Sequence, residues 1–122
     1  MNMDDFEPAP VKPGISYDEL EKIDVRIGTI LAVDDIEGAE KLVKLTVDFG
    51  DHQRSILAGI KEERPNPGAI RGRQALFVVN LKPRRMRGEL SEGMLFDIGY
   101  ADGLVPRLAV PESPVPNGTR AG

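Results

Sequence analysis

The sequence of 122 residues contains no cysteine, no tryptophan and a single histidine, His52. The absence of cysteine excludes a disulfide framework, a thiolate metal site and a thiol nucleophile. A single histidine also excludes a cluster of imidazole ligands, so we expect neither a metal site nor a bound cofactor. His52 falls with Asp51 in a predicted turn, and Ser91 has no histidine beside it in its motif, so we find no apparatus for nucleophilic catalysis. We therefore predict that the protein is not an enzyme.

Long apolar runs are also missing. No segment approaches the roughly 20 consecutive apolar residues that a membrane-spanning helix needs. The first ten residues, MNMDDFEPAP, are acidic and contain proline, unlike the basic start and apolar centre of a signal peptide. We therefore expect a cytoplasmic protein without a membrane segment, and the length predicts one domain with a single modest core.

The net charge is low, at −4, but it is distributed unevenly. Residues 64–88 include seven basic residues and no acidic one, whereas the remainder holds the other nine basic residues against all 20 acidic ones, a net charge of −11. A basic run can be no more than a solvated face, but seven positive charges without a negative one favour a site for a polyanion. The basic residues of this block are Arg64, Arg71, Arg73, Lys82, Arg84, Arg85 and Arg87.

The N-terminal residues divide into a lead-in and the start of a domain. Residues 1–14 contain three prolines and little apolar material, which predicts a flexible segment. Ser16 followed by Glu19 fits a capping box, so we expect a short helix over about residues 17–22. The folded domain is therefore expected over residues 15–122.

From Ile23 onward, apolar residues alternate with polar ones, which is the pattern of half-buried strands. The odd-numbered residues up to Val33 form one face of the first strand, although Ile30 lies on the other, and Gly28 is expected at a bulge or sharp bend. The connection over 60–73, interrupted by prolines and glycines, has room for one helical turn. The expected strands cover residues 23–33, 43–49, 53–59, 75–81 (buried on both faces) and 94–100, with a short sixth strand within 104–110.

Five or six short strands, with helix only at caps and connections, predict an all-β protein. The expected fold is the OB-fold, a five-stranded Greek-key barrel, here with a short N-terminal helix; an SH3-like barrel is the alternative. OB barrels grip ligands with the loop between strands one and two and the loop between strands four and five. These loops are residues 37–41 and 82–91 here, so the basic residues fall at the expected ligand site.

The residue types in this second loop suit an RNA ligand. Arginine presents a planar fork of donors that matches phosphate oxygens. Met86 either packs on a base or tucks back into the core, Asn80 either contacts a ligand or only caps a strand end, and Ser91 either shapes the pocket or only forms a turn. Most of the few aromatic residues look core-bound, which favours recognition of RNA shape and backbone over base stacking. The expected RNA-binding residues are Lys41, Asn80, Lys82, Arg84, Arg85, Met86, Arg87 and Ser91.

Residues 80–94 read NLKPRRMRGELSEGM, which matches the signature Asn-Leu-x-Pro-x-Lys/Arg-Met-Arg-Gly-x-x-Ser-x-x-Met. DVRIGTI at 24–30, AEKL at 39–42 and VPNG at 115–118 are similar to three further elements of the same pattern. Over about residues 16–120 the chain thus resembles the tRNA-binding domain family. The family includes free-standing tRNA-binding proteins and the C-terminal domain of many methionyl-tRNA synthetases.

The resemblance implies an OB barrel that binds tRNA by its shape, as a homodimer when free-standing, and alone or with a methionyl-tRNA synthetase. Ile36 and Glu37 depart from the His-Pro of many members, whereas Lys41 is retained. The related CsaA-type secretion chaperones share the barrel and are thought to bind unfolded preprotein segments, which is the alternative function. Those chaperones tend to differ in the Met-Arg-Gly segment, intact here at 86–88, so we favour a non-catalytic tRNA-binding protein acting through loop 82–91.

Overall fold

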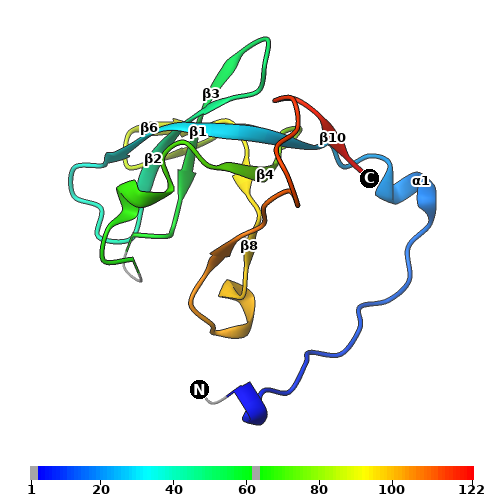
Figure 1. Cartoon of the computed structure of the whole chain (residues 1–122). Helices are drawn as coiled ribbons and strands as arrows, with labels where there is room; N and C mark the ends of the chain where they lie inside the picture. Colours follow the sequence, from blue (N-terminus) through cyan, green and yellow to red (C-terminus); the bar gives the residue numbers. More distant parts are fainter. Residues whose placement is uncertain (1–2, 62–63) are drawn as a thin grey trace.

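In the computed structural model, which describes residues 3–61 and 64–122, the chain is a curled antiparallel sheet with very little helix (Figure 1). Residues 1–2 of the expected N-terminal segment and residues 62–63 of the expected connection lie outside the described residues. None of the helices in the described ranges is long and apolar enough to cross a membrane. The elements are η1 (Met3–Asp5), α1 (Tyr17–Leu20), β1 (Val25–Asp35), β2 (Val43–Asp48), β3 (Gln53–Ala58), η2 (Pro67–Ile70), β4 (Gln74–Val78), β5 (Arg84–Met86), β6 (Glu89–Ser91), β7 (Met94–Leu95), β8 (Asp97–Ile98), η3 (Tyr100–Asp102), β9 (Arg107–Leu108) and β10 (Arg120–Ala121).

The main sheet has the strand order β3-β2-β1-β4-β7, and β10 pairs with the start of β1. The sheet curls until the segment after β6 reaches β3, where Glu92 N–H donates to Ser55 O at 2.8 Å. This is the strand order of an OB barrel, so the predicted all-β fold is confirmed. The short N-terminal helix is also confirmed: α1 is capped by Ser16, whose Oγ accepts a hydrogen bond from Glu19 N–H at 3.2 Å.

A bulge in β1 changes which of its residues face the core. The register with β2 shifts between Ile30 and Ala32, so Leu31 is the extra residue of the bulge. Ile30 is fully buried and Leu31 is 37% exposed, so the expectation of one odd-numbered core face was wrong. We expected the bulge at Gly28, but it lies three residues further along β1. Gly28 serves close packing instead, since a Cβ there would lie 2.5 Å from Val47 Cγ1.

The core fills the inside of the curl and is formed by a cluster of apolar side chains. Phe77 on β4 is fully buried and packs edge-on against Phe49, with ring centroids 5.6 Å apart. The run 75–81 is buried as predicted at Ala75, Phe77 and Val78, but the strand ends at Val78, and Leu81 is 48% exposed. The core therefore ends where the chain turns toward the basic hairpin.

The expected strand over 94–100 is broken into β7 and β8 at Phe96, whose N–H donates to Leu76 O at 3.0 Å. Leu95 is the buried residue of this segment, at 6% exposure. Phe96, Tyr100 and Tyr17 are exposed, and only Phe49 and Phe77 of the six aromatic residues are buried, so the expectation that most of them lie in the core was wrong. The chain leaves the barrel here because β8 pairs with β9, which is the expected short sixth strand (Figure 1).

The C-terminal residues close the barrel over the start of β1. Ile27 N–H donates to Thr119 O at 2.9 Å, and Gly118 N–H donates to Ile27 O at 2.7 Å. Asn117 Oδ1 accepts a hydrogen bond from Thr29 Oγ1 at 2.8 Å. This C-terminal strap, residues 115–121, is therefore part of the barrel wall, and Figure 1 shows its last strand beside β1.

Candidate nucleic-acid interface

The expected basic loop is a β-hairpin in the structure. β5 and β6 pair with Arg84 opposite Ser91. Arg87 and Gly88 form the two-residue connection, and both have positive φ, 53° and 79°. Mirror-image turns of this kind match the twist of paired strands, and glycine adopts them without steric cost. The basic side chains are therefore carried by a hairpin of defined register rather than by an open loop.

Met86 fixes this hairpin to the loop between β1 and β2. Its side chain is half-buried and, like that of Leu42, packs on a small buried cluster formed by Ile36, Ala39 and Leu57. The sequence left open whether Met86 packs on a base or turns back into the protein. The structure shows it turned back into the protein. The two loops that were expected to grip a ligand therefore lie side by side.

Two lysines reinforce the same junction. Lys44 Nζ on β2 lies 3.4 Å from Glu89 Oε2 on β6. Lys61 Nζ lies 3.0 Å from Asp35 Oδ1, at the end of β1, and donates to Ala39 O at 3.5 Å. Partly exposed ion pairs contribute little to stability. Their consequence here is geometric, because they link β2, the hairpin and the loop after β1.

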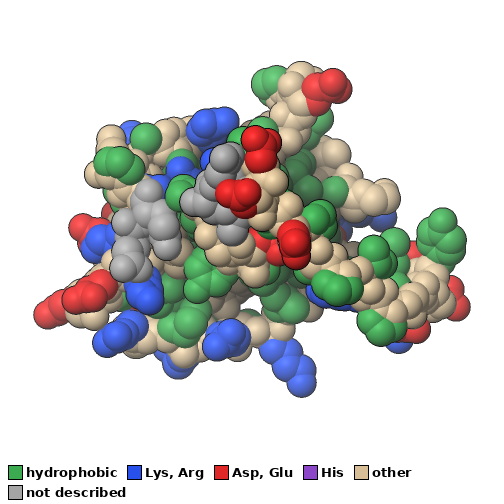
Figure 2. All heavy atoms as spheres, turned by 90° about the horizontal axis from the view of Figure 1, so that it is seen from below, with side chains coloured by type: hydrophobic (Ala, Val, Ile, Leu, Met, Phe, Trp, Pro, Cys, Tyr) green, Lys and Arg blue, Asp and Glu red, His purple; other side chains and the backbone are tan. Residues whose placement is uncertain are grey.

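The hairpin leaves its own cations in solvent. Lys82, Arg84, Arg85 and Arg87 are all exposed, and none of them forms an ion pair with another residue in the described ranges. Figure 2 shows Lys and Arg side chains along the lower left margin of the face seen from below. Guanidinium groups without an acidic partner keep their donors for an outside anion. This surface is therefore suited to a polyanion.

The remaining basic residues of the sequence block lie apart from the hairpin. Arg71 and Arg73 lie beside β1, in the segment between η2 and β4. Arg64 donates a hydrogen bond to Pro106 O at 3.3 Å. The block that is continuous in sequence is thus divided in space, and only its second half forms the candidate interface.

A cavity of about 620 Å³ lies where the hairpin tip faces the loop between β1 and β2. Two expected site residues, Lys41 and Arg87, line it together with Glu40 and Tyr100. Much of the remaining wall comes from residues 38–42 and contains small or apolar side chains. The volume falls within the range of about 300–1,000 Å³ that is usual for ligand sites.

Ser91 is buried, at 4% exposure, and both of its hydrogen-bonding functions are used within the chain. Its Oγ accepts a hydrogen bond from Leu57 N–H at 3.0 Å and donates one to Gly93 O at 3.1 Å. Ser91 thus joins β6 to β3 and holds the base of the hairpin. Contact between Ser91 and RNA stays a prediction.

The substitution Ser91→Ala is expected to lower the free energy of unfolding by about 1–3 kcal/mol, because the buried Leu57 N–H loses its acceptor. Urea unfolding followed by circular dichroism measures this change. The salt dependence of tRNA binding should stay as in the parent protein. Unchanged stability with a weaker salt dependence would instead identify Ser91 as an RNA contact.

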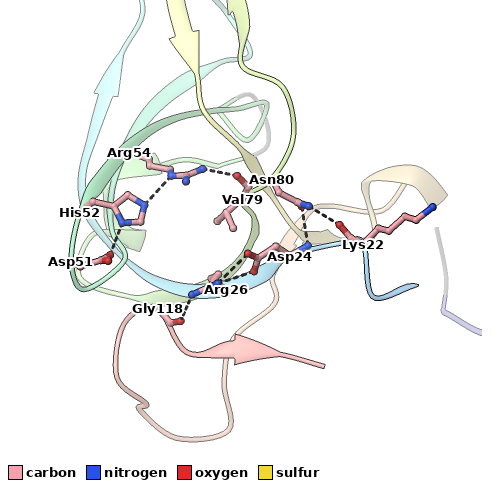
Figure 3. Close-up of polar contacts among 9 residues, drawn as sticks. All are labelled: Lys22, Asp24, Arg26, Asp51, His52, Arg54, Val79, Asn80 and Gly118. Carbon is pink, nitrogen blue, oxygen red and sulfur yellow. Dashed lines mark hydrogen bonds and ion pairs between the residues drawn. The ribbon is translucent and has the colours of Figure 1, made fainter. Parts of the chain in front are cut away.

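Asn80 lies at the opposite end of β1 from the cavity. Its Oδ1 accepts a hydrogen bond from Asp24 N–H at 2.8 Å, and its Nδ2 donates to Lys22 O at 2.6 Å (Figure 3). These bonds tie the end of β4 to the entry of β1, which is the capping role left open by the sequence. Asn80 is therefore not brought together with Lys41 and Arg87, and its contact with RNA stays a prediction.

The same end of the barrel carries one ion pair, Asp24–Arg26, and a chain of hydrogen bonds through His52 (Figure 3). Arg26 donates from Nε and Nη2 to the Asp24 carboxylate at 2.8 and 3.1 Å, which holds the pKa of Asp24 below its usual value and raises the pKa of Arg26. Arg54 Nε donates to His52 Nε2 at 3.0 Å, so the proton of the neutral imidazole is on Nδ1. That nitrogen lies 2.6 Å from Asp51 Oδ1, and this hydrogen bond lowers the pKa of Asp51.

The Asp24–Arg26 pair predicts a small loss of stability in acid. Because the pKa of Asp24 is lowered in the folded state, its contribution is present above the unfolded pKa of about 3.9 and is lost as the pH falls through the folded value. Asp24→Asn should therefore lower the free energy of unfolding at pH 7 by less than about 1 kcal/mol, as for other solvent-exposed pairs. Urea unfolding at pH 7 and about pH 2.5 measures the difference, which should be smaller at the lower pH because Asp24 is then more protonated. A difference as large at the lower pH as at pH 7 would contradict the assignment.

Tyr100 is the cavity residue that the sequence did not reveal. The alternation from residue 94 to residue 100 suggested one continuous strand, with Tyr100 at its end. Gly99 and Gly103 on either side were the available signal, because two glycines only four positions apart favour a turn. In the structure these residues bracket η3, and Tyr100 is 61% exposed.

Comparison with known proteins agrees with this geometry. The family model described as "Putative tRNA binding domain" matches residues 25–120. Methionine–tRNA ligase of Lactiplantibacillus plantarum is 38% identical over 105 residues, which are 85% of this chain and 15% of the ligase. The chain therefore spans only a small part of the length of this curated relative.

Solved structures agree over nearly the whole chain. The MetRS related protein from Pyrococcus horikoshii is 35% identical, with a TM-score of 0.83 over 91% of this chain and 100% of that one. The chaperone CsaA of Bacillus anthracis is 28% identical, with a TM-score of 0.79 over 90% of this chain and 100% of that one. Both similarities extend well beyond the hairpin to the barrel as a whole.

Proposed function

We propose, from the premise that this chain belongs to the tRNA-binding domain family, that it binds tRNA through the β5–β6 hairpin and the adjoining loop between β1 and β2. One observation carries the proposal. Four exposed cations, Lys82, Arg84, Arg85 and Arg87, lie on a hairpin anchored by Met86, without acidic partners in the described ranges. Phosphate oxygens are the ligands that such a set of donors fits best.

The proposed binding is non-catalytic and follows the shape and backbone of the RNA. The cations reach phosphates, which fix the register of the RNA without reading its sequence. The remainder of the chain, with a net charge of −11 outside residues 64–88, repels polyanions and so orients the protein toward RNA by one face. Residues 15–122 form the binding domain in this proposal, and a tRNA ligand places its action in the cytoplasm.

The activity of the ligase is not carried over, because this chain corresponds to only 15% of that enzyme. We infer that the chain acts as a separate binding module, either alone or in association with a methionyl-tRNA synthetase. A homodimer fits a free-standing module because two copies present two basic surfaces to one RNA. Sedimentation of the protein with and without tRNA tests this assembly.

The proposed function is tested by titrating fluorescent tRNA with the protein at several salt concentrations. The logarithm of the affinity should fall linearly with the logarithm of salt, with a slope of about −3 to −4 for four or five phosphate contacts. An unfolded polypeptide added as competitor should not displace the tRNA. Absence of binding at low salt would contradict the proposal.

A second candidate function, chaperone-like binding of unfolded preprotein segments, is favoured by a specific surface. A groove of about 1,110 Å³ lies between α1 and the C-terminal strand. The exposed apolar residues Tyr17, Leu20, Ile23 and Phe96 contribute to its wall. Apolar binding of this kind would survive high salt, whereas binding to the hairpin would not.

A further inference from the structure

The cavity at the hairpin tip combines two cations with an aromatic ring, which the proposed function alone does not require. Backbone recognition needs only exposed positive charge. Here Lys41, Arg87 and Tyr100 all line the cavity, and the side chain of Tyr100 is 61% exposed although its ring is largely apolar. A ring held beside cations in a concave site matches the two halves of a nucleotide, a flat base and a charged phosphate.

Tyr100 is held in place by its backbone rather than by burial. Tyr100 N–H donates to Asp97 Oδ1 at 3.2 Å, and Gly103 N–H donates to Tyr100 O at 3.1 Å. The turn therefore holds the backbone of Tyr100 beside the cavity that this residue lines, and its side chain stays outside the core. Such a ring offers a stacking surface at low ordering cost, since tyrosine has few rotatable bonds.

The charges around the ring are arranged on the loop and the hairpin tip. Arg87 is held at the tip by the turn between β5 and β6, and Lys41 lies in the loop that Met86 anchors. Glu40 also lines the cavity and has the wrong sign for a phosphate. Its carboxylate suits the exocyclic amino group of a base, which donates hydrogen bonds.

We propose that this cavity receives one unpaired nucleotide of the bound tRNA, with the base against Tyr100 and the phosphate toward Lys41 and Arg87. The proposal rests on the proposed function and adds to it a single base contact within a surface that otherwise contacts the backbone. The cavity volume of about 620 Å³ leaves room for one nucleotide together with bound water. Bases in RNA loops are free to enter such a site because they are not paired.

Removing the ring should weaken tRNA binding without changing its salt dependence. Tyr100→Ala is expected to lower the affinity about 5- to 100-fold, the usual effect of losing one stacked base. The slope of affinity against salt should stay unchanged because no phosphate contact is lost. Tyr100→Phe keeps the ring and should bind like the parent protein. Tyr17→Ala is the matched control, since Tyr17 is exposed on α1 outside this cavity.

Tyrosine fluorescence gives a direct readout, because the chain has two tyrosines and no tryptophan. In Tyr17→Phe, Tyr100 is the only tyrosine, and its emission should be quenched as tRNA is added. AMP and an unfolded polypeptide are titrated in parallel. Quenching by either of these with none by tRNA would overturn the proposal.

The tRNA-binding function and the nucleotide site at Tyr100 can be disproved separately. If the parent protein does not bind tRNA at low salt, the proposed function is wrong and the nucleotide site is wrong with it. If tRNA binds but Tyr100→Ala has the parent affinity, only the nucleotide site is wrong. Because Tyr100 is 61% exposed, its replacement should leave the fold intact, which circular dichroism checks.

Discussion

Replacing Arg84, Arg85 and Arg87 together by glutamine is expected to reduce the salt slope of tRNA binding by about two to three units. At about 0.1 M salt this corresponds to an affinity roughly 100- to 1,000-fold lower. The reason is that each exposed guanidinium releases counterions from a phosphate when it binds, and these three are not paired with acidic residues in the described ranges. Fluorescence anisotropy of labelled tRNA at four or more salt concentrations measures both quantities.

The matched control is the triple substitution of Arg71, Arg73 and Arg107 by glutamine. These arginines are also exposed and lie outside the hairpin, so the change in net charge is the same while its location differs. The control should lose far less affinity than the hairpin variant. Equal losses in the two variants would mean that net charge, rather than the hairpin, determines binding.

The largest expected effect on stability comes from Gly118→Ala, at about 2–4 kcal/mol. Gly118 has a φ of 90°, which strains any residue with a Cβ. The added Cβ would also collide with Phe49 O, so the C-terminal strap must shift. That shift breaks the hydrogen bond from Gly118 N–H to Ile27 O, which joins the strap to β1.

Urea unfolding of Gly118→Ala beside Gly14→Ala tests this expectation. At Gly14 no atom lies near the added Cβ and φ is not positive, so Gly14→Ala should change the free energy of unfolding by less than about 0.5 kcal/mol. If Gly118→Ala were as stable as Gly14→Ala, the strap would not be part of the barrel. The hairpin lies apart from the strap, so tRNA binding by the folded fraction should be retained.

The sequence predicted where the strands lie. It did not predict, for some strands, which residues face the core. Alternation located β1 and β2, and in β2 every second residue is buried while those between are half-exposed. The turn at residues 50–52 located β3, whose own burial does not alternate. Alternation failed at Leu31 and Phe96, where a bulge and a strand break shift the two-residue period. Such shifts depend on register with neighbouring strands, which a single sequence does not encode locally.

The distribution of charge and the order of the strands predicted where the candidate site lies. They did not predict which residues form it. The run Lys82 to Arg87 predicted a basic ligand loop because topology places that connection at the ligand site of an OB barrel, and the structure shows this loop as the β5–β6 hairpin. Ser91 and Asn80 lie in the same motif, yet their polar atoms hydrogen-bond within the chain. Tyr100 was missed because the alternation over residues 94–100 suggested one continuous strand, and because its neighbours in the cavity come from residues 38–42, far away in sequence.

The central claim is that tRNA binds where the β5–β6 hairpin meets the loop between β1 and β2. Backbone amide chemical shifts of the isotopically labelled full chain, recorded with and without tRNA, test it most directly. We predict changes concentrated in residues 38–42, in residues 82–91 and at Tyr100. Changes concentrated instead in residues 20–26 and 119–122, which line the groove beside α1, would contradict it.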